Sequence, residues 1–267
     1  MRKIYVLGPA FSYSYNLAVK KYANWEIICC ESITEAIKQA MQGGSTRALV
    51  PVENMLGGSV RETLFSLQKK NAQIVQAIDY EINNVIAAQK SSFKKVASHS
   101  QALDQCNNFI QKRKLEKIEI TATSKAMELA AEDEEVAAIG SPEAAQHYGL
   151  KVISQKISNQ ANNTTRFLEI KRADQGKERA AGEKTSLIIT PKEDRAGLLF
   201  EILSVFQVKK INLTKIESMP TGRKMNDYLF YLEIEGALKD KEVKEAINFL
   251  RTWMKVDVFG SYNTISC

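Results

Sequence analysis

The sequence predicts an α/β protein with two domains that are joined by a charged linker. Three observations lead to this prediction. Short apolar runs alternate with segments of helical periodicity through residues 3–172, which is typical of a parallel or mixed sheet covered by helices. Residues 173–184 are charged or small and lack apolar periodicity, as expected of a linker. Residues 185–262 follow the order strand, helix, strand, strand, helix, strand, which is typical of a split βαβ sandwich.

The first part of the alternating region predicts three strands, each followed by a polar loop and a helix. Ser32 and Glu35 have the spacing of a helix-capping box, and Gly43-Gly44 ends the helix that they begin. The predicted strands are residues 3–7, 26–30 and 48–52, and the predicted helices are residues 14–22, 33–41 and 60–67. Ligands of such sheets usually bind at the carboxyl ends of the strands, so the loops after these strands are candidate binding sites.

The next part of the chain predicts a second lobe. Residues 72–88 are rich in Ile and Val and are expected to form two strands that cross to this lobe. Its further predicted strands are residues 96–97, 118–120, 136–139 and 152–154, and its predicted helices are residues 101–113, 123–132 and 142–148. The strand from Val152 and the segment after Phe167 are expected to return the chain to the first lobe. The polar stretch Asn162–Phe167 would then lie at a crossing between lobes, where ligand sites are common.

The composition argues against several classes of protein. The chain has 37 basic and 31 acidic residues and a net charge of +6, but the basic residues are dispersed, so no nucleic-acid partner is expected. No segment is apolar enough for a membrane span, and the apolar run before Gly8-Pro9 is too short for a signal peptide, so we expect a cytoplasmic protein with reduced thiols. The four cysteines lack the spacing of metal ligands, and with two histidines no metal site is expected.

The stretch Asn162–Phe167 places amide, hydroxyl and guanidinium groups between two apolar runs. Polar turns of this kind are common, so an ordinary turn is the simplest interpretation. The guanidinium of Arg166 also matches two carboxylate oxygens, and the neighbouring hydroxyl of Thr165 can donate a proton or hold a leaving oxygen. The functional interpretation is therefore a site for an acidic small molecule.

Other polar segments allow two interpretations as well. Glu53-Asn54 with Gly57–Ser59 forms either a strand-end turn with an ordinary helix entry or an anion site at a helix N-terminus. A lone histidine such as His99, placed between a strand and a helix, is more often structural. Arg195–Leu199 begins a helix that serves either as scaffold or as an effector site. The Gly-bearing loops match neither a dinucleotide fingerprint nor a phosphate loop, and no spacing of Ser, His and Asp indicates a hydrolase.

Several segments, in this order, resemble motifs of the prephenate dehydratase family. The signature N-x-T-R-F is matched by Asn163–Phe167. The other matching segments are Val50–Asn54 with Gly58–Val60 (family V-P-I-E-N-S-x-x-G-S-V), Ser98–Leu103 with Gln105-Cys106 (family S-H-P-Q-A-L), Ile139–Leu150, Ala196–Leu199 (family G-A-L) and Asn212–Pro220 (family N-L-t-k-I-E-S-R-P). The resemblance covers essentially the whole chain.

The resemblance implies a domain order. It implies a two-lobed catalytic domain of the periplasmic-binding-protein type (type II) over residues 1–172, with lobe 1 at about 1–78 plus 156–172 and lobe 2 at about 79–155. A linker over residues 173–184 then precedes a ferredoxin-like βαββαβ regulatory domain of the ACT type over residues 185–267. We expect the chain to assemble as a homodimer or homotetramer.

The resemblance also implies a lyase activity. Family members convert prephenate to phenylpyruvate by loss of water and carbon dioxide, without metal or organic cofactor, on the route to L-phenylalanine, which is the expected feedback effector. An alternative within enzymes is arogenate dehydratase, whose substrate carries an amine where prephenate has a keto group. An alternative from another class is a non-catalytic amino-acid sensor.

The motif residues suggest individual roles. Thr165 would donate a proton or hydrogen bond to the leaving hydroxyl, and Arg166 would hold a substrate carboxylate. The candidate substrate-binding residues are Ser12, Asn54, Ser59, Asn163 and Phe167, of which Phe167 is expected to pack. The candidate effector-binding residues are Ala196, Gly197, Leu198, Leu199, Asn212, Leu213, Glu217 and Ser218.

The chain departs from the family pattern at several positions. Phe11 replaces a glycine of the N-terminal motif, which is expected to alter the loop because Phe takes left-handed conformations at a cost. Ser12 replaces a threonine and keeps the hydroxyl. Met55 and Ser100 replace a serine and a proline, and Met219 replaces an arginine of the regulatory motif, which removes a cation.

Overall fold

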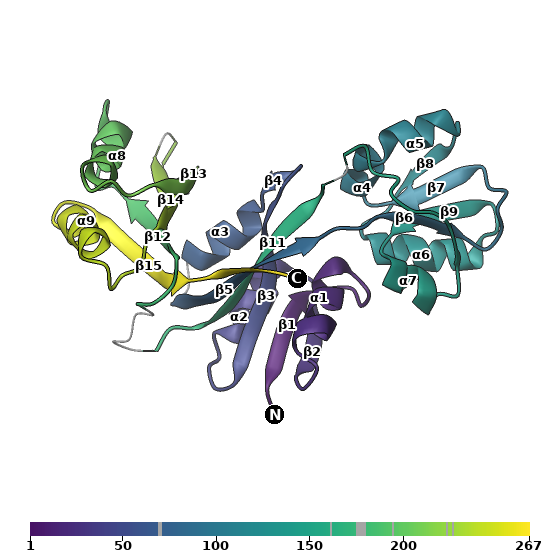
Figure 1. Cartoon of the computed structure of the whole chain (residues 1–267), viewed down its shortest axis with the longest axis horizontal. Coiled ribbons are helices and arrows are strands. Elements are labelled where there is room, and N and C mark those ends of the chain that lie inside the picture. Colours follow the sequence, from purple (N-terminus) through teal and green to yellow (C-terminus); the bar gives the residue numbers. More distant parts are fainter. Residues whose placement is uncertain (69–70, 161, 175–179, 194, 223, 226) are drawn as a thin grey trace.

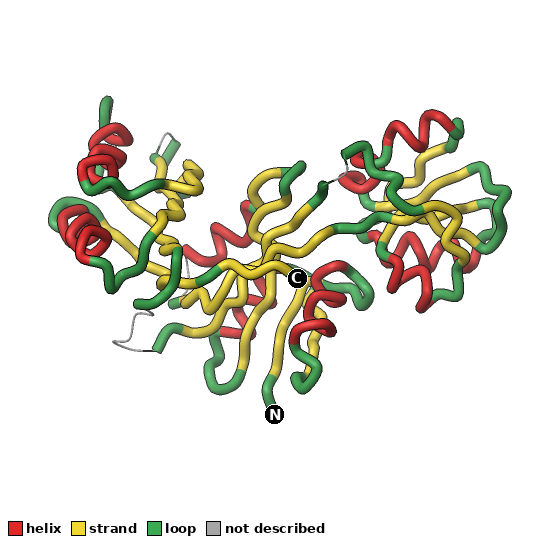
Figure 2. Tube along the Cα trace, in the orientation of Figure 1, coloured by secondary structure: helices red, strands yellow, loops and turns green. Residues whose placement is uncertain are grey.

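The computed structural model contains three sheets that lie in a row (Figure 1). It describes residues 1–68, 71–160, 162–174, 180–193, 195–222, 224–225 and 227–267. A seven-stranded sheet lies in the middle, a five-stranded sheet on one side and a four-stranded sheet on the other. Figure 2 shows that helices pack against each of them, which confirms the predicted α/β class. Within the described ranges, no helix combines the length and the apolar character that crossing a membrane requires.

The central sheet forms the first lobe, with the strand order β16-β5-β11-β3-β1-β2 and with β4 paired to β3. β1 runs parallel to β2 and β3, whereas β11 is antiparallel to β3 and β5. Its strands are β1 (Lys3–Leu7), β2 (Glu26–Cys30), β3 (Thr46–Asn54), β4 (Gly58–Ser59), β5 (Ala72–Glu81), β11 (Thr164–Arg172) and β16 (Thr264–Ser266). Its helices are α1 (Tyr13–Lys21), α2 (Ile33–Ala40) and α3 (Arg61–Gln68).

Most of the polar stretch Asn162–Phe167 belongs to a strand, whereas an ordinary turn was its simplest interpretation. β11 begins at Thr164 and pairs with strands on both of its sides, so Thr165 and Arg166 are strand residues. Successive side chains of a strand point to opposite faces of the sheet. Thr165 and Arg166 are therefore directed to opposite sides of the central sheet.

The last strand of the chain lies in the central sheet. β16 runs parallel to β5, with Thr264 opposite Ala77, and the Cys267 N–H donates to the Asp79 carbonyl at 3.0 Å. We expected residues 185–267 to form the C-terminal domain as one unit. This pairing instead returns the end of the chain to the first lobe, where backbone hydrogen bonds hold it.

The second lobe is built on the five-stranded sheet, in the order β10-β6-β9-β7-β8. The chain enters it after β5 and leaves it before β11. Its strands are β6 (Val85–Ala88), β7 (Lys95–Ser98), β8 (Glu116–Glu119), β9 (Val136–Gly140) and β10 (Lys151–Ser154). Its helices are α4 (Ser100–Gln105), α5 (Asn107–Lys112), α6 (Thr123–Glu132) and α7 (Pro142–His147), so the helix predicted over residues 101–113 is divided at Cys106.

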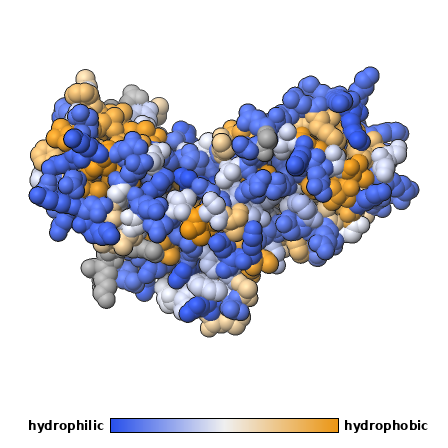
Figure 3. Space-filling view, viewed as in Figure 1, coloured by the Kyte–Doolittle hydropathy of each residue, from blue (hydrophilic) through white to orange (hydrophobic). Residues whose placement is uncertain are grey.

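The four-stranded sheet forms a C-terminal module with the predicted βαββαβ order. The strand order is β13-β14-β12-β15, and β13 is an edge strand. Its strands are β12 (Lys184–Thr190), β13 (Leu213–Pro220), β14 (Tyr228–Glu235) and β15 (Lys255–Tyr262), and its helices are α8 (Leu198–Val208) and α9 (Lys241–Arg251). Apolar surface gathers around α8 in Figure 3, where Phe200 and Val208 are exposed.

The module and the first lobe share one hydrophobic core. One face of the four-stranded sheet packs on α8 and α9, and Ile202, Phe206 and Leu250 are among the buried residues of that cluster. The other face contributes Tyr231 and Tyr262 to a cluster that also contains residues of β3, β5 and β11. Burial on both faces joins the C-terminal module closely to the sheet that carries Thr165.

Candidate active site

A cavity of 250 Å³ lies between the two lobes of the catalytic region. The first lobe contributes residues that follow β1, the end of β3 and the start of β11, and the second lobe contributes the beginnings of α4 and α6. Asn54, Asn163, Thr165 and Phe167 line this cavity, together with Ser12. The structure thus brings together five of the seven residues that the sequence suggested for catalysis and substrate binding.

The side-chain amide of Asn54 is fixed in one orientation. Its Oδ1 accepts from the backbone N–H groups of Leu56 at 3.1 Å and of Gly57 at 2.9 Å. A backbone N–H can only donate, so the opposite side of the amide must be the NH₂ group. Its Nδ2 donates to Asn163 Oδ1 and to Thr165 Oγ1, both at 2.9 Å.

This arrangement makes the Thr165 hydroxyl a donor towards the cavity. Its Oγ1 already accepts a hydrogen bond from Asn54, and no acceptor for its proton is found among the residues that the structure describes. The residue is 8% exposed and lines the cavity. A hydroxyl that accepts one hydrogen bond becomes a stronger donor, so the site presents the Thr165 proton to a ligand.

The hydrogen bonds continue into the second lobe. Asn163 Nδ2 donates to Gln105 Oε1 at 2.9 Å, and Gln101 Nε2 donates to Asn54 Oδ1 at 3.2 Å. Both glutamines belong to α4. Because this helix is part of the second lobe, these two bonds link the side chains of Asn54 and Asn163 to that lobe.

Tyr13 and Asn84 extend the same polar network. The Tyr13 hydroxyl donates to Asn84 Oδ1 at 2.7 Å. Burial, assisted by the carboxylate of Glu143, raises the pKa of Tyr13 well above its ordinary value, which keeps the phenol protonated. Sequence reasoning did not select Tyr13, Asn84, Gln101 or Gln105 as site residues. The available signal was the motif around Ser98–Cys106, which contains both glutamines.

The cavity offers uncharged donors to an anion. Among the described residues that line it, none is Lys or Arg. α1 begins at the cavity with Ser12 as its N-cap, and α6 begins there at Thr123 without a side-chain cap on its first N–H groups. The N-terminal ends of helices attract negative charge through these N–H groups.

Arg166, which we expected to hold a substrate carboxylate, is not among the residues that line this cavity. On the opposite face of β11, its Nε and Nη2 donate to the two carboxylate oxygens of Asp79 at 2.7 and 2.9 Å. The hydrogen-bonded Asp79 raises the pKa of Arg166 above its ordinary value, although burial opposes the shift. Arg166 is therefore engaged in a protein ion pair and does not present its guanidinium to a ligand in this cavity.

Three further predicted positions also have partners within the protein. Ser12 Oγ donates to the Leu7 carbonyl at 3.1 Å and caps α1 by accepting from the Tyr15 N–H. Ser59 Oγ donates to Glu217 of the C-terminal module at 3.1 Å. Phe167 is 2% exposed and packs as expected.

Ser59 lines a second, larger cavity between the lobes. That cavity has a volume of 680 Å³ and shares Asn54, Gln101 and Gln105 with the first one. The amide groups of Asn54 and the two glutamines thus lie between the two cavities.

The N-terminal loop does adopt the left-handed conformation that we expected to be costly for Phe11. This residue has φ of 63°, and its ring stacks on His147 of the second lobe with a centroid distance of 3.7 Å. The aromatic contact offsets the backbone cost and adds a further link between the lobes.

The eight candidate effector residues lie on two elements of the C-terminal module. Leu198 and Leu199 begin α8, Gly197 is its N-cap and Ala196 directly precedes it, and Leu198 is buried in the core. Asn212, Leu213, Glu217 and Ser218 lie in or next to β13. Glu217 contacts Ser59 and Arg61 of the first lobe, and Met219 is buried in the shared core.

The fold and the cavity define a two-lobed α/β domain with a site between its lobes, joined to a βαββαβ module. The family model of prephenate dehydratase matches residues 4–175, and that of the ACT domain matches residues 192–252. The chain belongs to the prephenate dehydratase family.

Known relatives match over nearly the whole chain. A prephenate dehydratase of Methanocaldococcus jannaschii is 37% identical over 269 residues, which is 97% of each chain. Arogenate dehydratase/prephenate dehydratase 2 of Arabidopsis thaliana is 34% identical and covers 96% of this chain and 71% of its own.

Two solved structures share the fold. The prephenate dehydratase of Staphylococcus aureus has a TM-score of 0.85 at 28% identity, covering 98% of this chain and 100% of its own. The prephenate dehydratase of Arthrobacter aurescens in complex with L-Phe has a TM-score of 0.89 at 27% identity, covering 98% of this chain and 90% of its own.

Proposed function

We propose that this chain converts prephenate to phenylpyruvate with loss of water and carbon dioxide. The observation that carries the proposal is the Thr165 hydroxyl, which Asn54 holds so that its proton is directed into the cavity between the lobes. Membership of the prephenate dehydratase family gives the substrate class.

The reaction needs a donor at the oxygen that leaves. Departure of the ring carboxylate as carbon dioxide leaves its bonding electrons in the ring, and these electrons expel the ring hydroxyl. The hydroxyl leaves as water when it gains one proton, and the ring becomes aromatic. A threonine hydroxyl is a weak acid, so Thr165 stabilises the leaving oxygen by hydrogen bonding while solvent supplies the proton.

The two carboxylates of prephenate would be bound by neutral groups. The N-terminal ends of α1 and α6, with the hydroxyls of Thr121 and Thr123, lie around the cavity. Such donors hold an anion without placing a cation where it would retain the departing carboxylate. In this mechanism Arg166 has a structural role and does not bind the substrate.

Arogenate is the second candidate substrate. Relatives from Arabidopsis thaliana carry the names of both activities. In this chain, the exposed carboxylate of Asp104 lines the larger cavity, where it would favour the ammonium group of arogenate.

We further propose that L-phenylalanine regulates the enzyme through the C-terminal module in a homodimer or homotetramer. The module belongs to the ACT domain family, and a solved relative is in complex with L-Phe. The candidate effector residues at the start of α8 and on the edge strand β13 would then meet a second copy of the chain.

One experiment separates these functions. The purified protein is incubated with prephenate and with arogenate, and phenylpyruvate and phenylalanine are followed with and without added L-phenylalanine. The proposal expects phenylpyruvate from prephenate and inhibition by L-phenylalanine. Formation of phenylalanine from arogenate alone would identify the second candidate, and absence of both products would favour an amino-acid sensor.

A further inference from the structure

A cluster of charged side chains connects the C-terminal module to the strand that carries Thr165. It consists of Asp79 on β5, Arg166 on β11, Glu233 on β14 and Lys184 on β12. Two of its members are cationic and two are anionic, so the cluster is balanced in charge. We call these four residues the boundary cluster.

Within the boundary cluster, Arg166 is held from two directions. Asp79 lies directly opposite Arg166 in the pairing of β5 with β11, and its carboxylate oxygens accept hydrogen bonds from Nε and Nη2. The remaining nitrogen, Nη1, lies 3.7 Å from Glu233 Oε1. A planar guanidinium that is bound along one side and approached at its free end has little rotational freedom.

Glu233 is itself firmly positioned by the C-terminal module. Its side chain is 4% exposed, and Oε1 accepts from Lys184 Nζ at 2.7 Å and from the Thr214 hydroxyl. Its Oε2 accepts from the Tyr262 hydroxyl at 2.9 Å. With both oxygens bound, the carboxylate offers Arg166 a fixed rather than a mobile charge.

The backbone next to Arg166 lacks a regular hydrogen-bond ladder on the side that faces β3. The register of β11 with β3 shifts between Arg166 and Phe167, because Glu53 pairs with Arg166 whereas Pro51 pairs with Phe167. Bulges of this kind interrupt pairing and redirect side chains, and they occur next to active sites. The ion pair of Arg166 with Asp79 therefore adds a side-chain anchor next to Thr165, at the point where the pairing of β11 with β3 becomes irregular.

A second link joins the C-terminal module to the same place. β16 follows Tyr262 closely and pairs with β5, and its residue Ser266 lies opposite Asp79. The module therefore holds Arg166 through Glu233 and holds Asp79 through the backbone of β16.

We propose that Glu233 is a positioning residue for the dehydratase reaction, which acts through Arg166 to direct the Thr165 hydroxyl into the cavity. The expected effect of Glu233 on turnover rests on the proposed function, the dehydration of prephenate. It assigns a role in catalysis to a residue of the C-terminal module that lies on the opposite face of the sheet from the substrate.

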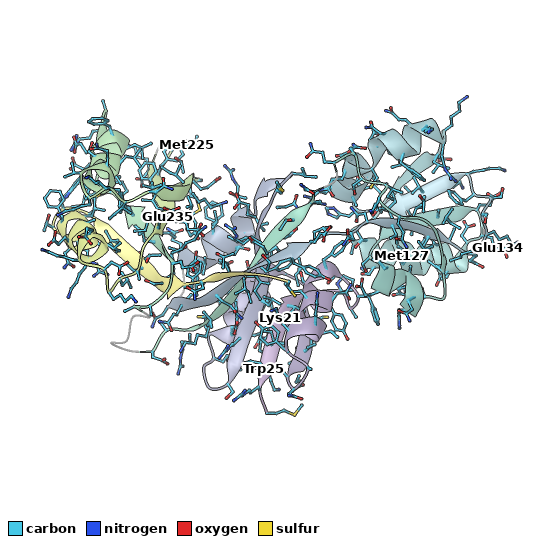
Figure 4. All side chains as sticks on the ribbon, in the orientation of Figure 1. Lys21, Trp25, Met127, Glu134, Met225 and Glu235 are labelled. Carbon is cyan, nitrogen blue, oxygen red and sulfur yellow. The ribbon has the colours of Figure 1, made fainter. Side chains whose placement is uncertain are left out.

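The test compares Glu233→Gln with Glu235→Gln in the full-length protein. Glu235, labelled in Figure 4, lies on the same strand two residues further on and is exposed, so it controls for the same chemical change. We expect Glu233→Gln to lower kcat about tenfold with KM within about twofold of wild type, because a small displacement of a catalytic group reduces turnover. Glu235→Gln should match wild type.

A conservative change at Arg166 provides a second variant. Arg166→Lys keeps the positive charge but loses the paired bonds to Asp79, and it should likewise lower kcat without raising KM. A rise in KM with unchanged kcat would instead indicate that Arg166 binds the substrate and would overturn the proposal. Wild-type kcat in a folded Glu233→Gln protein would overturn it as well.

A readout without turnover separates this inference from the proposed function. The methyl resonance of Thr165, assigned by its absence in Thr165→Val, should shift in Glu233→Gln and not in Glu235→Gln. An unchanged resonance contradicts the positioning role even if the enzyme is active. A shifted resonance supports it even if prephenate proves not to be the substrate.

Discussion

Replacement of Asn54 by aspartate is expected to disable Thr165 without removing it. Asn54→Asp keeps the side-chain size and the oxygen that accepts from the Leu56 and Gly57 N–H groups. The nitrogen that donates to Asn163 and Thr165, each at 2.9 Å, becomes an oxygen that only accepts. The Thr165 proton would then turn to the new carboxylate and away from the cavity.

The size of the effect follows from the loss of one donor. Removing an aligned donor from a site where charge develops lowers kcat by on the order of 10²–10³, or about 2.7–4 kcal/mol. Thr165→Val removes the same donor, so its expected cost is equal. If both changes act on one hydrogen bond, the double variant also loses on the order of 10²–10³, whereas independent effects would sum to about 5.4–8 kcal/mol.

The assay is the rate of phenylpyruvate formation from prephenate by wild type, the two single variants and the double variant. Asn108→Asp makes the same change at an exposed position of α5 and should match wild type. The reasoning is refuted if Asn54→Asp retains wild-type kcat, or if the losses in the double variant are additive.

Two other predictions concern the second lobe and the response to pH. Gln105→Leu removes the acceptor for Asn163 Nδ2 and should lower kcat by on the order of tenfold, measured by the same assay; unchanged turnover would contradict a role for the network between the lobes. Burial raises the pKa of Glu233, but the hydrogen bonds from Lys184, Thr214 and Tyr262, together with the charge of Lys184, outweigh it, so the pKa lies below its ordinary value. The resulting stabilisation is complete above the unfolded-state pKa of about 4.3 and is lost as pH falls through the lower folded-state value. The free energy of unfolding, measured in urea from pH 6 to 3, should be higher for wild type than for Glu233→Gln, and this difference should shrink as the pH falls. A difference that stays constant would contradict the stabilising role of the Glu233 carboxylate.

Much of the architecture could be predicted because it follows from local patterns. The Ser32 hydroxyl caps its helix as predicted by accepting from the Glu35 N–H at 3.1 Å, whereas the Glu35 carboxylate accepts from the Glu31 N–H at 3.0 Å and not from that of Ser32. The βαββαβ order of the C-terminal module follows from the alternation of apolar runs with helical periodicity. The loop after β3 was a candidate site because strand ends converge in α/β sheets, and Asn54 indeed lies beside Thr165.

The direction of Arg166 could not be predicted from its neighbours in the sequence. Arg166 points to its face of the sheet because Thr164–Arg172 form a strand. The sequence also allowed a turn over the first residues of this segment. The partners of Arg166 are Asp79 and Glu233, which are distant along the chain. A guanidinium next to a hydroxyl suggested one shared site, whereas strand alternation separates the two groups.

Long-range pairing explains the other differences. β16 has three residues and no periodic pattern of its own, so only its pairing with β5 shows that it belongs to the first lobe. Gln105 is one of many polar residues on helices, and its importance depends on Asn163 from a segment far along the chain. The φ of Phe11 depends in the same way on the stacking partner His147.

The most direct test of the central claim compares Thr165→Ser with Thr165→Val. Serine keeps the hydroxyl that accepts from Asn54 and donates into the cavity, whereas valine keeps the shape and lacks the donor. We expect Thr165→Ser to retain a kcat for prephenate within about tenfold of wild type and Thr165→Val to lose on the order of 10²–10³. Equal turnover by the serine and valine variants would contradict the assignment of Thr165 as the donor to the leaving oxygen.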